Sequence, residues 1–291
     1  MRERAVALMR ELQDGIIAGL EDLDGAGTFC RDEWSRPGGG GGVTRVLAGG
    51  AVIEKGGVNV SEVHGHFSDE FARQVPGSGT AFFATGVSLV IHPESPHVPT
   101  VHANFRYIEH GDKSWFGGGA DLTPYYFDAN DKEHFHRVWC DVCAAHENVA
   151  DYGRFSKWCD RYFYLPHRGE RRGVGGIFFD HLWANDAVYA FVAAAGRSFL
   201  DAYLPVARRH KDEPVTAAQR EWQLYRRGRY VEFNLIYDRG TTFGLKTGGR
   251  TESILMSLPP AVRWGYCYDA EPGTPEAALL DELRRPPPPD E

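Results

Sequence analysis

The sequence predicts a single α+β domain, residues 1–291, in which α-helices cover a large and mainly antiparallel β-sheet. The middle of the chain alternates apolar and polar residues, or carries short apolar runs rich in β-branched and aromatic side chains, as β-strands do. Long stretches of helical character lie between these runs, an order that is typical of antiparallel sheets covered by helices. No repeat and no convincing linker divides the chain, so we expect one domain.

The individual elements follow from local patterns along the chain. Residues 1–25 mix acids and bases throughout and lack the apolar core of a signal peptide, which predicts an amphipathic surface helix. Residues 230–245, YVEFNLIYDRGTTFGL, predict a β-hairpin that turns at Asp238-Arg239-Gly240. The proline-rich C-terminus predicts a disordered tail over about residues 280–291. Further strands are expected at 51–65, 81–93 and 100–110, and helices at 132–164 and 185–210.

Composition argues against several classes of partner. A net charge of −8 and a pI near 5.8 do not favour nucleic acid or an anionic membrane. No run of about eighteen apolar residues occurs, so we expect no membrane span. The five cysteines are odd in number and unevenly spread, unlike a secreted disulfide framework, which favours the cytoplasm.

Two basic clusters stand out against this acidic background, HRGERR and YRRGRY. They predict either local anion sites or simply a solvated face. Their arginines are Arg168, Arg171, Arg172, Arg226, Arg227 and Arg229.

The strand expected at 100–110 carries an unusual polar face. Because side chains alternate along a strand, His102, Asn104 and Arg106 share one side, opposite Phe105 and its neighbours. A polar strand face is often just the solvated side of a sheet. Here it mixes an imidazole, an amide and a guanidinium, and it leads through a predicted glycine turn at 117–119 to an acid. That acid is Asp121. On the strand expected at 81–93, Ser88 and His92 also share one face. This combination favours a binding site.

A second candidate site is the segment TGGRTESILMSLPP. Gly248 and Gly249 permit backbone conformations that expose N–H groups, Arg250 adds a planar guanidinium, and Thr251 could cap a short helix. Such groups attract carboxylates or phosphates, although a plain helix-capping turn is an equally good interpretation. The Gly-Lys-Ser/Thr ending of a nucleotide phosphate loop is absent from the segment. Carboxylate recognition is therefore favoured over nucleotide binding.

Histidines are frequent, and they raise the question of a metal site. Cys140 and Cys143 form a CxxC pattern, but the second pair of ligands that structural zinc sites use is absent, so buried cysteines on one helix face are expected. A site assembled in three dimensions remains open, as does the alternative of histidines that only satisfy hydrogen bonds. The candidates are His92, His102, His136 and His167.

Several long blocks together carry a family resemblance: GGVNVSEVHG, HANFRY, WFGGGADLTPYY, WCDRYFYLPHRGERRGVGGIFFD, and the stretch from QLYRRGRY to SILMSLPP. From about Gly15 to Ala278 the chain resembles the oxygen-dependent coproporphyrinogen III oxidases. The resemblance implies a broad antiparallel sheet flanked on both faces by helices, and a homodimer. It also implies oxidative decarboxylation of two propionates of coproporphyrinogen III to vinyl groups. The products are protoporphyrinogen IX, CO2 and H2O2, and the pathway is haem synthesis.

The resemblance further implies a role for each candidate residue. Asp121 would accept the pyrrole N–H groups, and His102 would be the proton donor. Arg106 and Arg250 would hold propionates, and Arg172 is a weaker candidate for the same work. Other substrate contacts would come from Ser88, Asn104, Phe105, Gly248 and Gly249.

Molecular oxygen is the implied co-substrate and no organic cofactor is needed, whereas a divalent metal ion on His92, His102, His136 and His167 is implied for some relatives only. Two other functions remain as alternatives: a non-catalytic tetrapyrrole-binding protein and a His-ligated, metal-dependent oxygenase.

Overall fold

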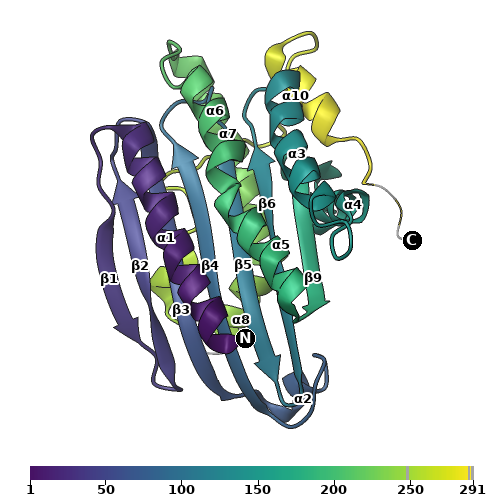
Figure 1. Cartoon of the computed structure of the whole chain (residues 1–291). Helices are drawn as coiled ribbons and strands as arrows, with labels where there is room; N and C mark the ends of the chain where they lie inside the picture. The colour runs from purple at the N-terminus through teal and green to yellow at the C-terminus, as the bar shows by residue number, and fades with distance from the viewer. Residues whose placement is uncertain (247–248, 288, 290–291) are drawn as a thin grey trace.

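The structure is a computed structural model that describes residues 1–246, 249–287 and 289. Its centre is an antiparallel β-sheet with strand order β1-β2-β3-β4-β5-β6-β9 (Figure 1). The predicted α+β fold with a large antiparallel sheet is therefore confirmed. The strands are β1 Cys30–Ser35, β2 Gly40–Ala48, β3 Ile53–His66, β4 Ala81–Pro93, β5 Thr100–His110, β6 Lys113–Thr123 and β9 Gly176–Trp183.

The triple glycine 117–119 lies inside strand β6, so the predicted glycine turn is wrong. Close approach of neighbouring groups, and not chain reversal, explains the glycines. A Cβ on Gly117 would lie 2.5 Å from Oδ1 of Asp180, and one on Gly118 would lie 2.5 Å from the Asn104 carbonyl oxygen. Because β6 continues straight through these residues, Asp121 pairs directly with His102 of β5.

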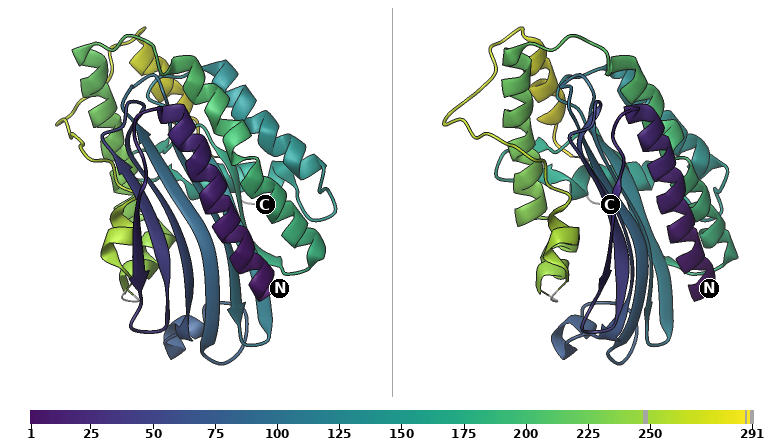
Figure 2. Two further views of the ribbon diagram at one scale, coloured as in Figure 1. Left: turned by 60° about the vertical axis from the view of Figure 1, so that its left-hand side comes forward. Right: turned by 90° about the vertical axis from the view of Figure 1, so that its left-hand side faces the viewer.

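One face of the sheet is covered by α1, α3, α5 and α6 (Figure 2). The predicted N-terminal helix is confirmed, and its buried side chains include Leu8, Leu12 and Ile16. The helical stretches expected at 132–164 and 185–210 are confirmed, but each is divided into two helices. The helices are α1 Arg2–Asp24, α3 Ala129–Ala144, α4 Tyr152–Tyr162, α5 Asp186–Arg197 and α6 Phe199–His210.

The opposite face carries α7 Ala217–Ile236, α8 Arg239–Lys246 and α9 Thr251–Leu255 (Figure 2). The β-hairpin predicted for 230–245 is therefore wrong. A short apolar run can belong to either a strand or a buried helix, and Tyr230 and Phe233 are in fact buried along α7. Asp238 does not turn a hairpin: its carboxylate accepts the Thr241 N–H and so starts α8.

Shorter elements complete the fold. Helix α10, Pro275–Leu283, buries Leu280 and Leu283, so the first residues of the expected C-terminal tail are helical and packed. The remaining elements are α2 Asp69–Ala72, β7 Tyr164–Leu165 and β8 Glu170–Arg171. Within the described ranges, none of the helices combines the length and the apolar character that a membrane crossing requires.

Candidate active site

A pocket lies between the sheet and the helices α7, α8 and α9. Strands β4 and β5 form one wall of the pocket, and aromatic residues at the end of α4 form another. Helix α7 and the start of α8 form the remaining wall. Its described lining residues are Ser88, Val90, His102, Asn104, Arg106, Tyr162, Phe163, Arg172, Phe178, Tyr230, Asn234, Asp238, Gly240, Thr241, Ser253, Ile254, Met256 and Ser257.

The predicted polar face of β5 forms part of this pocket. His102, Asn104 and Arg106 all line it, and Ser88 of β4 pairs with Asn104 in the sheet register. Phe105 is fully buried in the hydrophobic core. Its predicted contact with a ligand is therefore wrong for the side chain, because strand alternation directs Phe105 to the other face of the sheet.

His102 is held by a buried ion pair. Its Nδ1 atom lies 2.8 Å from Oδ1 of Asp121, and Nη2 of Arg172 donates to both Asp121 oxygens at 2.7 Å. Burial alone would raise the pKa of Asp121, but the charges of Arg172 and His102 outweigh it and hold that pKa below its ordinary value. Since the anionic carboxylate accepts the proton on Nδ1, Nε2 is the His102 nitrogen that remains for proton transfer.

Asp121 itself is not among the lining residues, and its side chain is only 2% exposed. Arg172 lies beside it, with Cζ 4.0 Å from the ring centroid of Phe163 and 4.6 Å from that of Tyr230. Nη1 of Arg172 donates to Oδ1 of Asn234 at 3.0 Å. In this structure the predicted acceptor for pyrrole N–H groups is therefore occupied by two protein donors.

Arg106 has a different environment. Nη1 donates to Oδ1 of Asn104 at 3.0 Å, and Nη2 donates to Oδ2 of Asp180 on β9 at 2.7 Å. The Arg106 side chain is 28% exposed, so solvent or a ligand can reach it. Asp180 was not predicted from the sequence, although the glycine at position 117, next to both groups, could have indicated a crowded site.

A further carboxylate, that of Asp238, does line the pocket. It accepts the hydroxyl proton of Tyr162 at 3.0 Å and the backbone N–H of Thr241 at 2.7 Å. Asp238 was not predicted as a pocket residue, because the sequence pattern indicated a hairpin turn there. A helical period would have found it, since Tyr230, Asn234 and Asp238 follow one another at intervals of four residues and all line the pocket.

The predicted site at 248–250 is not part of the described pocket lining. Gly248 lies outside the described residues. The Gly249 N–H donates to the Gly244 carbonyl at 2.8 Å, and Nη2 of Arg250 pairs with Oδ2 of Asp32 on β1 at 2.5 Å. Thr251 does not cap α9, because the N-cap residue is Arg250 and has no side-chain capping bond.

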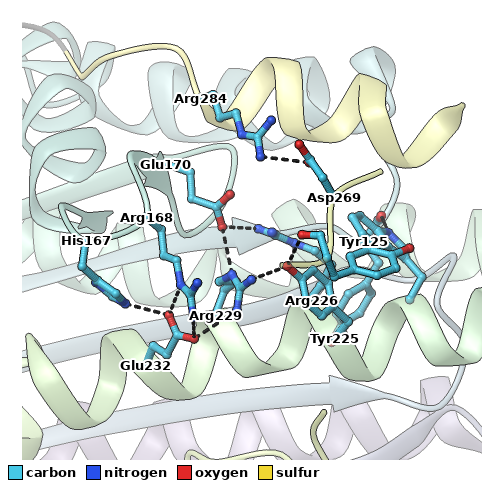
Figure 3. Close-up of polar contacts among 12 residues, drawn as sticks. Tyr125, His167, Arg168, Glu170, Tyr225, Arg226, Arg229, Glu232, Asp269 and Arg284 are labelled. Atoms are coloured by element: carbon cyan, nitrogen blue, oxygen red, sulfur yellow. Dashed lines mark hydrogen bonds and ion pairs between the residues drawn. The ribbon is translucent and has the colours of Figure 1, made fainter. Parts of the chain in front are cut away.

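The arginines of the two clusters pair with carboxylates of the protein itself. Figure 3 shows Arg168 and Arg229 directed at the carboxylate of Glu232, with Arg226 directed at Glu170. Burial would raise the pKa of Glu232, but hydrogen bonds from Arg168 and His167 lower it to about 2. These arginines therefore bind internal carboxylates and join α7 to the segment around β8.

A family model for coproporphyrinogen III oxidase matches residues 4–288. The chain belongs to the coproporphyrinogen III oxidase family. The match covers nearly the whole chain, so the resemblance carried by the sequence blocks is confirmed. It supports an oxidoreductase of porphyrin biosynthesis that acts on coproporphyrinogen III.

The four histidines predicted as candidate metal ligands do not fit a shared ion here. Nε2 of His92 lies 2.9 Å from the Ser257 carbonyl oxygen, and Nε2 of His136 lies 2.8 Å from that of Val174. Nε2 of His167 contacts Glu232 at 2.7 Å, and His102 contacts Asp121. Each imidazole therefore serves a different part of the fold.

Within the described residues, the group whose ligand atoms do converge is Asp128, Asp131 and His210, none of which lines the pocket. Arg209 also contacts Asp131 there, which is unfavourable for a cation. Of the two CxxC cysteines, Cys143 is buried as expected, whereas Cys140 is exposed, so that half of the prediction is wrong.

Proposed function

We propose that the protein is an oxygen-dependent coproporphyrinogen III oxidase. It converts two propionates of coproporphyrinogen III to vinyl groups and gives protoporphyrinogen IX. For each propionate, the carboxylate, one O2 and one proton give a vinyl group, CO2 and H2O2. The observation that carries this proposal is the His102–Asp121 pair at a pocket that also presents Arg106, in a chain of this family.

His102 is the proposed source of the proton that the balance requires. Asp121 stabilises the imidazolium through Nδ1, and Nε2 delivers the proton to the oxygen species in the pocket. A deprotonated pyrrole is electron-rich enough to react with O2 directly. We therefore propose that no organic cofactor takes part.

The remaining polar groups of the pocket bind the substrate. Arg106 accepts a propionate, because a guanidinium matches a carboxylate in geometry and charge. Ser88 and Asn104 lie beside it on the sheet. We propose that the carboxylate of Asp238, which lines the pocket and also accepts from Tyr162 and Thr241, accepts pyrrole N–H groups. Asp121, which is buried beside Arg172 and does not line the pocket, acts by orienting His102.

The cysteines support oxygen as the oxidant. An oxidation without O2 would need another electron acceptor, and one class of acceptor, the iron–sulfur cluster, is held by several cysteine thiolates. All five cysteines are described, and they contribute to no group of converging ligand atoms in the part of the chain that the structure describes. All five are free thiols, which supports the cytoplasm as the compartment.

A homodimer is part of the same proposal. Leu235 and Ile236 at the end of α7 are 49% and 57% exposed, and Leu245 of α8 is 44% exposed. Exposed apolar side chains on two consecutive helices favour an interface with a second copy of the chain. Light scattering of the purified protein would give twice the monomer mass, and a monomer would contradict this part of the proposal.

Turnover tests the function directly. Purified protein is given coproporphyrinogen III with and without O2, and protoporphyrin fluorescence is followed after oxidation together with CO2 and H2O2. We expect product only with O2, with equal amounts of CO2 and H2O2. Product formed equally well without O2 would contradict the proposal, and tight binding of coproporphyrin without any product would favour a tetrapyrrole carrier.

A further inference from the structure

Two buried hydrogen-bond donors of the pocket residues have no acceptor. They are the Tyr230 hydroxyl and the Nε–H of Arg172, and neither proton has an acceptor among the described residues. The Asn234 amide lies near the Tyr230 oxygen, but an amide in that role donates to the oxygen and leaves the hydroxyl proton free. Both residues line the pocket. A buried donor without an acceptor costs roughly 1–3 kcal/mol, so such groups usually meet a ligand or water.

The two donors belong to neighbouring side chains. Cζ of Arg172 lies 4.6 Å from the ring centroid of Tyr230. The other nitrogens of the guanidinium are used, since Nη1 donates to Asn234 and Nη2 to Asp121. Nε is thus the group of Arg172 that stays available. Burial raises the pKa of Tyr230 well above its ordinary value, so its oxygen keeps the proton and acts as a donor.

The packing of Tyr230 does not require its hydroxyl. The ring lies edge-on to His92, with centroids 5.0 Å apart, and it also stacks against Arg172. A phenylalanine would make the same ring contacts. The hydroxyl is therefore an added polar group at a position where packing alone calls for an apolar ring.

We propose that Tyr230 and Arg172 form an oxyanion-binding subsite of the pocket. This inference rests on the proposed function and extends it. The ligand is an oxyanion, and two sources are chemically equivalent here: a propionate carboxylate of the substrate, or the peroxide that forms from O2. Either would accept the hydroxyl proton of Tyr230 and the Nε–H of Arg172. Tyr230 is then a residue that touches the reacting molecule.

The test is Tyr230→Phe, which removes the hydroxyl and keeps the ring. We expect turnover to fall roughly 10- to 100-fold, as for a lost hydrogen bond to a charged group, with an unchanged thermal midpoint. Binding of coproporphyrin III, a stable tetracarboxylate that does not react, is measured in parallel by fluorescence. Weaker coproporphyrin binding assigns the subsite to a carboxylate. Unchanged binding with a lower kcat, or a higher KM for O2, assigns it to the oxygen species.

Tyr203→Phe is the matched control. Tyr203 is a buried tyrosine whose hydroxyl donates to the Pro99 carbonyl at 3.1 Å, and it is not a pocket residue. We expect this variant to lose stability but to keep turnover. If Tyr230→Phe leaves turnover and coproporphyrin binding unchanged, the subsite is refuted. If the wild type binds coproporphyrin but does not turn over, the proposed function fails, and the binding comparison alone decides whether the subsite exists.

Discussion

Arg172 and Arg106 make the same kind of contact in very different surroundings. Each guanidinium pairs with an aspartate at 2.7 Å. The side chains of Arg172 and Asp121 are both 2% exposed, whereas those of Arg106 and Asp180 are 28% and 18% exposed. Arg172 is also packed between aromatic rings.

The difference in burial indicates that the Arg172 pair has a structural role, whereas the Arg106 pair can be exchanged for a contact with a ligand. A buried ion pair cannot lose one partner without leaving an uncompensated charge, so Arg172 holds Asp121, and through it His102, in place. A partly exposed pair is weaker, because water replaces either partner at a smaller cost. Arg106 can therefore bind a substrate carboxylate while the Arg172 pair stays as it is.

The largest expected effect comes from breaking the buried pair. Asp121→Asn leaves Arg172 buried without a counter-charge, and we expect a loss of roughly 3–5 kcal/mol in the free energy of unfolding. Asp180→Asn is the matched change at the partly exposed pair, with an expected loss of about 1 kcal/mol or less. Urea unfolding of both variants measures the difference. Equal losses would show that burial does not distinguish the two arginines.

A smaller effect on stability, but a clear one on binding, is expected at Arg106. Arg106→Gln removes the charge that would meet a propionate, and coproporphyrin affinity should fall roughly 10- to 100-fold, as for a lost charge-assisted hydrogen bond. The unfolding midpoint should stay close to that of the wild type. Arg208→Gln, at a surface pair with Asp22, controls for the change in net charge. Unaltered affinity in Arg106→Gln would exclude this guanidinium from substrate binding.

The pH dependence of stability tests the effect of burial on a different side chain, His92. Burial, followed by the charge of Arg227, lowers the pKa of His92 from 6.5 to about 3. The unfolded chain thus takes up this proton below pH 6.5 while the folded protein does not. Stability is present in full above pH 6.5 and is lost as the pH falls toward 3.

His92→Gln removes the titration and should flatten that slope by up to about 1.4 kcal/mol per pH unit. Thermal or urea unfolding between pH 4 and 8 measures it for both proteins. An identical slope in the variant would mean that His92 titrates normally in the folded protein.

Strand residues were predictable from the sequence, because alternation alone places His102, Asn104 and Arg106 on one face. The ion-pair partners of these residues were not predictable. Asp180 lies 74 residues from Arg106, and Arg172 lies 51 residues from Asp121, so these pairs depend on how the sheet and loops meet in space. A local sequence pattern contains no information about contacts between such distant segments.

The β-hairpin prediction for residues 230–245 was wrong for a local reason. Their apolar run fits both a strand and a buried helix, and the choice between the two is made by burial against the rest of the fold. As a result the sequence interpretation missed Asp238 and Tyr230, two pocket residues at helical spacing. A short helix at Thr251 was predicted correctly, but the ion pair between Arg250 and Asp32 was not, because it depends on strand β1, far away in the chain.

The central claim is that His102 acts in proton transfer at this pocket and not as one of four metal ligands. We would measure protoporphyrin formation by chelator-treated wild type, His102→Asn and His167→Asn. We expect full activity of the treated wild type, a loss of about 100- to 10,000-fold for His102→Asn, and much smaller effects for His167→Asn. Activity that disappears on chelation and returns with a divalent cation, with both variants equally inactive, would contradict the claim.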